Sequence, residues 1–301
     1  MKIVIVKTHF TSQGGIEKYT KKIGTAFAAP ELGNDITLLT ESPLVPGLPS
    51  SIRIAQLPKS KGLQFLRLEQ FDRHVQNWIE KEAADIVFGV DRTRKQTHYR
   101  AGNGVHAAYL QSRLASEGIF KYTLCQINPL HRKILEIEKQ TFEYLGLRTL
   151  FVNSNMVKEE VLKYYAVDPG KIEVVHNGVE WEEKENDFAN WPEKKEEFLN
   201  MWKLPKDPLQ LLFIGNGYRR KGLDVLLQAL ATLQHKRFYL SVIGKEKNIA
   251  WYQEKILALG LSRHVRFFGS QVDTTPFYQM ADCLIIPSFY DPFANVTLEA
   301  L

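Results

Sequence analysis

Four short segments of the chain combine residue types that can bind a phosphorylated sugar. The first is Gln13-Gly14-Gly15-Ile16-Glu17, which separates a β-rich run from an amphipathic one. Paired glycines let the backbone approach a ligand closely, and the helix that follows offers free N–H groups and a positive dipole end to phosphate. A plain tight turn would use the same residues, so this segment alone favours neither reading.

The second segment is basic. Arg219-Arg220-Lys221-Gly222 follows an apolar run that ends at Gly215. Consecutive cations at the carboxyl end of a strand, with a glycine before the next helix, suit a pyrophosphate. This placement favours a binding role over a merely solvated loop.

The third segment carries two carboxylates, Asp291 and Glu299, eight positions apart. The loop acid can face a ligand, and the acid one turn into the following helix can accept hydrogen bonds from vicinal hydroxyls. Both acids could instead stabilise the helix start, which is worth up to about 1 kcal/mol. In isolation that second explanation is the better one.

The fourth segment, residues 99–106, contains Gly102, Asn103, Gly104 and His106. Two glycines, an amide and an imidazole in one loop suit close approach to a sugar. A histidine with a purely structural hydrogen bond explains the pattern equally well.

The surrounding pattern alternates strands and helices from the first residue onward, which predicts an α/β, doubly wound fold with parallel sheets. We expect domains at residues 1–176 and 177–301, with a turn-forming connection over 177–205. Strands are expected at 2–6, 35–39, 85–90, 149–153 and 172–176, then at 209–215, 238–244, 265–269 and 283–287. Helices are expected at 15–27, 65–81, 128–145 and 156–165, then at 223–233, 251–259, 277–281 and 295–301.

The composition is that of a soluble protein: 44% of the 301 residues are hydrophobic and 24% charged, with no apolar run long enough to span a membrane. Cys125 and Cys283 show no pairing or metal-ligand pattern, which favours a reducing cytoplasm. Residues 1–150 hold 21 Lys and Arg against 14 Asp and Glu, whereas residues 151–301 hold 18 against 20. The basic half indicates either an anionic partner, such as a phosphorylated lipid, a membrane surface or nucleic acid, or a well-solvated surface.

Taken in order, these motifs resemble the retaining GT-B glycosyltransferases of the family 4, or "glycosyl transferases group 1", type, which includes the lipopolysaccharide-core glucosyltransferases. The resemblance covers essentially the whole chain. Its most specific parts are Arg220-Lys221-Gly222 with Asp224, the connection 171–179, and the Asp291…Glu299 segment. The resemblance implies two Rossmann-like domains facing a cleft, an N-terminal one for the acceptor and a C-terminal one for the nucleotide sugar.

The resemblance also implies residue roles. Arg220 and Lys221 would hold the donor diphosphate, and Glu299 the ribose hydroxyls. Asp291 and the backbone around Phe293, Ala294 and Asn295 would contact the donor sugar. Gly14 and Gly15 would complete the phosphate cradle, while Asn103 and His106 would lie near the sugar, with His106 binding hydroxyls or assisting proton transfer.

The donor implied is a nucleotide sugar, UDP-glucose or a related UDP-hexose, and the acceptor a sugar on lipopolysaccharide core or another membrane glycolipid. No separate cofactor is implied. No two aspartates are two positions apart, so the Asp-x-Asp pair of metal-dependent transferases is absent from the sequence and we expect protein cations to replace a metal ion. The family docks its acceptor on the basic first domain, which here includes Arg92, Arg94, Lys95 and Lys133 with Lys59, Lys61, Arg113, Lys121 and Arg132. Peripheral contact with the inner face of the cytoplasmic membrane is therefore expected there. The sequence favours a position in the core for four apolar residues of this region, Phe65, Leu66, Phe71 and Trp78.

Three departures keep other functions open. Position 291 is Asp where the family usually has Glu, Asn103 stands where related sequences often have Asp, and the pattern stops inside a helix at 295–301. The second domain is therefore expected to be C-terminally incomplete, and a non-catalytic nucleotide- or glycan-binding relative or an inactive fragment is the alternative. A nicotinamide-dependent oxidoreductase is disfavoured because the first turn lacks Gly-x-Gly-x-x-Gly, and no recognised motif supports nucleic-acid binding.

Overall fold

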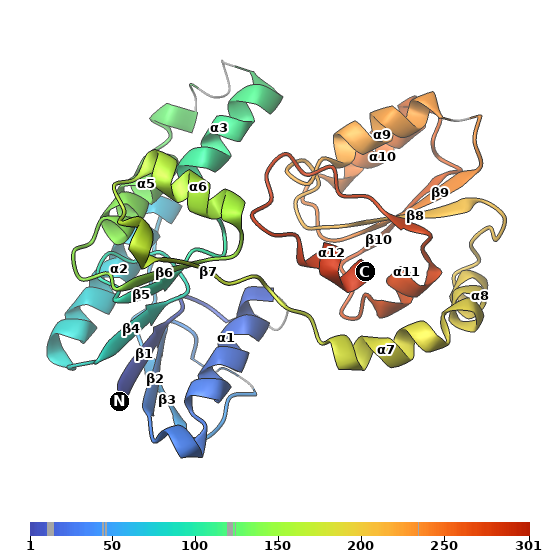
Figure 1. The fold of residues 1–301 in the computed structure, drawn as a ribbon. Coiled ribbons are helices and arrows are strands. Elements are labelled where there is room, and N and C mark those ends of the chain that lie inside the picture. The colour runs from blue at the N-terminus through green and yellow to red at the C-terminus, as the bar shows by residue number, and fades with distance from the viewer. Residues whose placement is uncertain (11–14, 44, 46, 119–122, 124, 234) are drawn as a thin grey trace. The chain divides into compact units, whose positions relative to one another are not determined.

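The computed structural model describes residues 1–10, 15–43, 45, 47–118, 123, 125–233 and 235–301. The chain divides into two compact units, Met1–His176 and Asn177–Leu301. Each unit is built on its own parallel sheet (Figure 1).

The first unit contains a seven-stranded sheet in the order β3-β2-β1-β4-β5-β6-β7, and every strand pairs in parallel with its neighbours. The strands are β1 (Lys2–Val6), β2 (Asp35–Thr40), β3 (Ile52–Gln56), β4 (Ile86–Gly89), β5 (His98–Arg100), β6 (Thr149–Val152) and β7 (Ile172–Val174). The α-helices are α1 (Gly15–Phe27), α2 (Gln64–Lys81), α3 (His106–Glu117), α5 (Pro129–Phe142) and α6 (Asn155–Tyr164), with short 3-10 turns at Pro30–Leu32 and Pro169–Lys171.

Strand β1 shows why this sheet has helices on both faces. Successive side chains of a strand point to opposite sides, and all four residues after Lys2 are apolar and buried. Ile3 and Ile5 join the core on the side of α1, whereas Val4 and Val6 join the core on the side of α2. An unbroken apolar run of this kind is typical of a parallel strand buried on both faces.

The second unit contains a four-stranded parallel sheet in the order β10-β9-β8-β11. Its strands are β8 (Leu209–Ile214), β9 (Phe238–Ile243), β10 (Val265–Gly269) and β11 (Cys283–Leu284). Its helices are α7 (Trp181–Ala189), α8 (Trp191–Met201), α9 (Leu223–Thr232), α10 (Ile249–Ala258), α11 (Thr275–Met280) and α12 (Asn295–Ala300).

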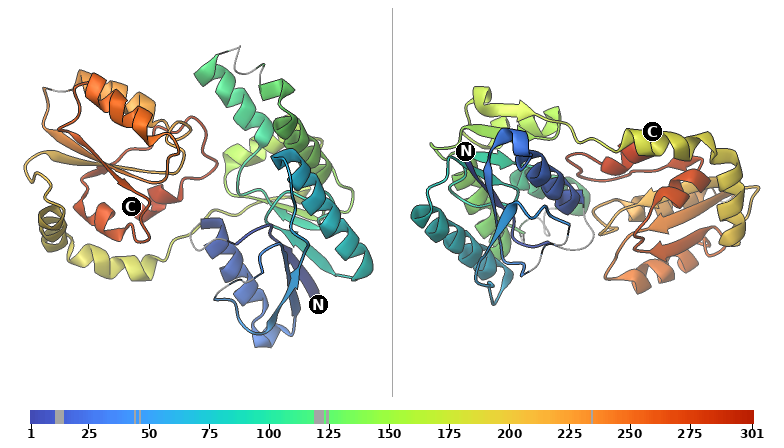
Figure 2. Two further views of the ribbon diagram at one scale, coloured as in Figure 1. Left: turned by 180° about the vertical axis from the view of Figure 1, so that it is seen from behind. Right: turned by 90° about the horizontal axis from the view of Figure 1, so that it is seen from below.

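The same alternation places helices on both faces of the second sheet. Leu211 and Phe213 of β8 pack into the core formed with α9 and α10, whereas Leu212 packs into the core formed with α8 and α11. Figure 2 shows the two pairs of helices on opposite sides of the sheet. The carboxyl ends of β8 and β9 are thereby held at one edge, where α/β sheets bind ligands.

Three expectations from the sequence were wrong in detail. The segment 177–205 was expected to be an irregular connection, but it contains α7 and α8, and Pro192 occupies the first turn of α8, where its missing N–H costs nothing. The segment 99–106 was expected to be a loop, but it begins in strand β5 and ends in the first residue of α3. The last strand, expected over 283–287, is only the two residues of β11.

Among the described residues, no helix combines the length and the apolar character that crossing a bilayer requires.

Candidate functional site

Two glycines, Gly222 and Gly244, let the loops at the carboxyl edge of the second sheet approach one another closely. A Cβ atom on Gly244 would come within 2.1 Å of the Gly215 carbonyl oxygen, and one on Gly222 within 1.9 Å of the Pro287 carbonyl oxygen. Gly222 also has a φ of +78°, which disfavours L side chains. Only glycine fits at these positions, and the loop after β8 is therefore packed directly on its neighbours.

Lys221 and Asp291 form an ion pair within this group of loops. The Lys221 Nζ donates to Asp291 Oδ2, and the two side chains are only 13% and 15% exposed. Arg220 joins the same loops, because its Nη1 donates to the Tyr290 carbonyl oxygen at 3.3 Å and its own carbonyl oxygen accepts from Phe289 N–H at 3.2 Å. The structure thus brings Arg220 and Lys221 together with Asp291, which lies 70 positions after Lys221 in the sequence.

The turn before α12 and the first residue of that helix comprise the other three residues expected near the donor sugar. Ala294 is the N-cap of α12 with an extended backbone, and its carbonyl oxygen accepts from Thr297 N–H at 2.9 Å. Asn295 Oδ1 accepts a 2.7 Å hydrogen bond from Asn177 Nδ2. Phe293 is half-buried beside them.

Glu299 has a partner other than the Lys221–Asp291 pair. Its Oε2 accepts a 2.6 Å hydrogen bond from the Tyr278 hydroxyl, and burial together with the Glu299 carboxylate raises the pKa of Tyr278. Both residues line a pocket of about 580 Å³ whose other lining residues are Trp181, Glu185, Phe188, Trp191, Thr275, Gln279, Ala281, Leu298, Ala300 and Leu301. Glu299 therefore already has a hydroxyl partner, of the kind that a ribose would supply.

In the first unit, Gly14 lies outside the described residues, and Gly15 begins α1. Asn103 is exposed in the turn after β5, and Gly104 closes that turn with a φ of +70°. His106 is the first residue of α3 and is half-buried.

A buried carboxylate determines the position of His106. Glu138 of α5 is completely buried and accepts from His106 N–H at 2.8 and 3.0 Å, from Arg92 Nε at 2.8 Å and from the Tyr165 hydroxyl at 2.7 Å. A buried charge is tolerated only when it is paired and hydrogen-bonded in this way. The start of α3 is consequently tied to α5 and to the loop after β4.

The His106 ring meets a second imidazole, that of His131. His106 Nε2 lies 3.1 Å from His131 Nδ1, and the ring of Tyr109 packs against the His106 ring at a centroid distance of 5.7 Å. Burial, helped by the charges of Arg92 and Arg113, lowers the pKa of His106 to about 3. The imidazole is therefore neutral at physiological pH.

Sequence reasoning did not single out His131 or Glu138. They are seven residues apart on one helix and so lie on the same side of it, which is the signal that could have linked them. What it could not show is that the start of α3 lies against that side.

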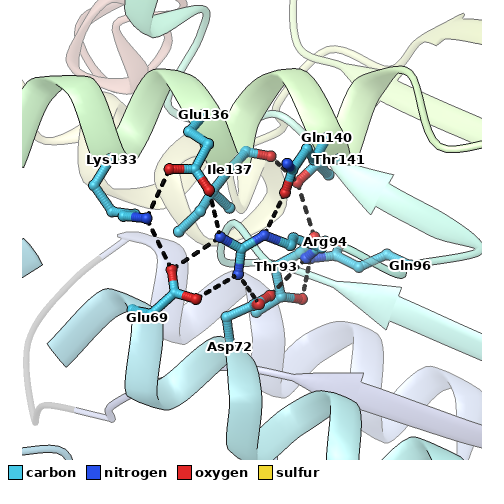
Figure 3. Close-up of polar contacts among 10 residues, drawn as sticks. All are labelled: Glu69, Asp72, Thr93, Arg94, Gln96, Lys133, Glu136, Ile137, Gln140 and Thr141. Atoms are coloured by element: carbon cyan, nitrogen blue, oxygen red, sulfur yellow. Dashed lines mark hydrogen bonds and ion pairs between the residues drawn. The ribbon is translucent and has the colours of Figure 1, made fainter. Parts of the chain in front are cut away.

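Several cations expected to dock an acceptor instead have partners inside the first unit. Arg94 donates to Glu69 and Asp72 of α2 and to Glu136 and Gln140 of α5, which joins the two helices (Figure 3). Lys133 pairs with Glu69 and Glu136, Lys95 with Glu80, and Arg92 with Glu138. These four side chains contribute less unpaired positive charge than the sequence suggests.

The apolar residues near this region divide between core and surface. Phe71 is buried and Trp78 is packed in the same cluster, as expected for core residues, whereas Leu66 is exposed. Lys59, Lys61 and Arg132 are exposed, and Lys121 lies outside the described residues. Among the residues that the structure describes, no three His, Cys, Asp or Glu side chains are grouped so as to hold a metal ion.

These two parallel α/β units define the GT-B fold, which consists of two Rossmann-like domains. The chain superposes on the crystal structure of WaaG, "a glycosyltransferase involved in lipopolysaccharide biosynthesis", with a TM-score of 0.79 and 22% identity, over 99% of this chain and 78% of that one. It also matches Anabaena Alr3699/HepE in complex with UDP-glucose, with a TM-score of 0.67 and 13% identity, over 100% of this chain and 78% of that one.

Sequence comparison gives the family. The profile described as "Glycosyltransferase Family 4" matches residues 13–183, and the one described as "Glycosyl transferases group 1" matches residues 194–301. The chain belongs to glycosyltransferase family 4 and is a glycosyltransferase. A similar curated protein is the lipopolysaccharide glucosyltransferase WaaG of Escherichia coli (strain K12), 24% identical over 96% of this chain and 74% of its own length. Another is the uncharacterized glycosyltransferase MJ1607 of Methanocaldococcus jannaschii, 31% identical over 49% of this chain and 38% of its own.

Proposed function

We propose that this chain transfers a hexose from a nucleotide sugar, with UDP-glucose as the leading donor, to a sugar acceptor on lipopolysaccharide core or another membrane glycolipid. The transfer retains the anomeric configuration and needs no metal ion. The enzyme works in the cytoplasm, at the inner face of the cytoplasmic membrane. The observation that carries this proposal is the Lys221–Asp291 pair with Arg220, at the carboxyl edge of the second sheet.

The charges at that edge suit the departure of a nucleoside diphosphate. Cleavage of the bond between the sugar and the diphosphate builds negative charge on the leaving oxygens, and cations fixed in advance lower the barrier to that step. Lys221 is held because its ammonium is mostly buried against Asp291, and the neighbouring Gly222 packs closely on the Pro287 carbonyl oxygen. The exposed Arg220 supplies a second positive charge with planar donors that match phosphate oxygens.

For a retaining reaction, the leaving phosphate can accept the proton of the attacking hydroxyl on the same face of the sugar. This route needs no protein nucleophile. Asp291 and the turn at Phe293, Ala294 and Asn295 would hold the donor sugar, and Glu299 would exchange the Tyr278 hydroxyl for those of the ribose.

In the first unit His106 is suited to bind a sugar hydroxyl rather than to act as a base. Its pKa of about 3 makes the neutral ring a weak proton acceptor at physiological pH, but leaves one ring nitrogen able to accept a hydrogen bond. Gly14 and Gly15 would contribute to the phosphate cradle, and Asn103 to the sugar contacts.

Two relatives support the donor and the acceptor. WaaG of E. coli is a lipopolysaccharide glucosyltransferase, and the HepE structure contains UDP-glucose. The exposed Lys59, Lys61 and Arg132 are the cations of the first unit on which we expect an anionic glycolipid or membrane surface to rest.

The test measures UDP release from UDP-glucose with and without extracted lipopolysaccharide core. We expect acceptor-dependent release that resists EDTA, and a loss of about 100- to 1,000-fold in turnover for Lys221→Met and Arg220→Ala. The matched control is Arg237→Ala, which removes an exposed arginine paired with Asp207 in the same unit and should leave turnover unchanged. Unchanged turnover in both site variants would refute the charge role, and UDP binding without transfer to any glycan would favour a non-catalytic relative.

A further inference from the structure

The contact between His106 and His131 needs one hydrogen atom between two ring nitrogens. His106 Nε2 and His131 Nδ1 are 3.1 Å apart, and the rings are tilted by 34° with their centroids 5.1 Å apart. At that distance one nitrogen must donate and the other accept, so the pair fixes the tautomer of both rings.

The groups around the pair keep both rings neutral. Burial and neighbouring cations, Arg92 and Arg113 for His106 and Arg113 for His131, lower the pKa of each imidazole. The nearby carboxylate, Glu138, is already engaged by Arg92 and by two other donors. Each ring therefore carries a single hydrogen atom at physiological pH.

The direction of the hydrogen bond follows from the chemistry of neutral histidine, whose imidazole intrinsically prefers to carry its hydrogen on Nε2. If His106 Nε2–H donates to His131 Nδ1, both rings adopt the preferred tautomer. The reverse direction would force both rings into the disfavoured Nδ1–H form. Only the first arrangement satisfies both preferences at once.

Helix α5 contacts both the ring and the backbone of His106. His131 and Glu138 lie two turns apart on α5, and they contact the ring and the backbone N–H of His106 respectively. Because Glu138 is completely buried and held by Arg92 and Tyr165, α5 forms a fixed support for the first residue of α3.

We propose that His131 is a positioning residue for His106: its Nδ1 accepts from His106 Nε2–H and thereby leaves His106 Nδ1 free of hydrogen, as an acceptor for a substrate hydroxyl. The role toward the substrate depends on the transferase function proposed above. The direction of the hydrogen bond does not.

The first experiment does not require activity. The protein is labelled with ¹⁵N-histidine, the His106 signals are assigned by their loss in His106→Gln, and the ring nitrogens are observed by NMR at pH 7. We expect the His106 Nε2 shift of a nitrogen that carries hydrogen and the Nδ1 shift of a bare nitrogen. A bare Nε2 in the wild-type protein would overturn the proposal.

Two substitutions then test the acceptor. His131→Phe keeps an aromatic ring but removes the acceptor, whereas His131→Asn places an amide oxygen close to the position of the Nδ1 atom. We expect the His106 signals to show mixed tautomers in His131→Phe and the wild-type tautomer in His131→Asn. Wild-type signals in both variants would show that His131 does not set the tautomer.

The kinetic counterpart uses the assay for UDP release. His131→Phe should lower kcat/KM about tenfold, the factor that one neutral hydrogen bond contributes, and His131→Asn should restore most of it. Equal losses in the two variants, with thermal unfolding unchanged, would reduce His131 to a packing role and overturn the proposal. An absence of activity in the wild-type protein would count against the proposed function alone, because the NMR result stands without it.

Discussion

The Lys221 ammonium and the Asp291 carboxylate pair with each other across 70 residues of sequence, at the carboxyl edge of the second sheet. The pair places an internal anion on the cation that we assign to the diphosphate. A bound diphosphate must therefore either compete with the Asp291 carboxylate for the Lys221 ammonium or bind beside the negative charge of that carboxylate.

Asp291→Asn should consequently strengthen the binding of free UDP while slowing transfer. We expect the Kd for UDP to fall about threefold or more. The substitution removes both the charge-assisted hydrogen bond that engages the Lys221 ammonium and the negative charge that repels the diphosphate. Turnover should fall, since Asp291 is also assigned to the donor sugar. Calorimetry with UDP and the UDP-release assay measure the two effects, with Asp291→Glu as the control that keeps the charge. Weaker UDP binding in Asp291→Asn would contradict the competition.

Gly222→Ala should destabilise the second unit by about 3 kcal/mol or more. The new Cβ would meet the Pro287 carbonyl oxygen at 1.9 Å, and the φ of +78° is unfavourable for alanine. Gly217→Ala is a matched control, because Gly217 has a φ of +70° but nothing within 4 Å of a Cβ atom. It should cost only about 1 kcal/mol. Urea unfolding followed by tryptophan fluorescence reports mainly on this unit, and equal losses in the two variants would rule out the steric contact with Pro287.

Glu138→Gln should destabilise the first unit by about 3 to 5 kcal/mol, because it leaves the Arg92 guanidinium without its buried counter-charge. Glu80→Gln removes a carboxylate that is 62% exposed and pairs with a half-exposed Lys95, so its effect should stay within about 0.5 kcal/mol. Amide hydrogen exchange in α3 and α5 provides the measurement. Similar amide protection in both variants would show that the stability of the first unit does not require the buried Arg92–Glu138 pair.

The stability of the first unit should fall as the pH drops below about 6.5, in part because of His106. Its folded-state pKa of about 3 lies below the ordinary value of 6.5, so the unfolded chain takes up the proton first. The stabilisation is complete above pH 6.5 and is lost progressively toward pH 3. Between pH 7 and pH 5 the loss from this group should reach up to about 2 kcal/mol. Unfolding curves of the wild-type protein and His106→Gln at both pH values test this, and identical pH dependence would contradict it.

The sequence identified the fold well where the strands are buried on both faces. Continuous apolar runs such as Ile3-Val4-Ile5-Val6 leave little choice of structure, and their alternation with amphipathic segments requires parallel pairing. It did less well for α8, where charged residues and Pro192 suggested a connection. The helix is held by Leu199, which packs into the core formed with α11, a contact that no local pattern reveals.

The candidate site shows the same division. Arg220, Lys221 and Asp291 could be placed together from the sequence, because each follows a strand of the same sheet and such ends share one edge. The partners of Glu299 and His106 could not be predicted from the sequence. Tyr278 and His131 reach these two residues through the packing of separate helices. Residues at strand ends were predictable, and those brought in by helix packing were not.

Because every strand pair in both sheets is parallel, neither sheet can begin as a local hairpin, and each pairing must wait for a distant partner to be synthesised. The first sheet has all its strands once the ribosome has released Val174, whereas the central strand β8 stays open on one side until Cys283 and Leu284 emerge. Translation of this chain should therefore pass through a stage in which a finished first unit precedes a second one with an unpaired, strongly apolar strand edge. That stage is when a nascent chain of this kind most needs a chaperone.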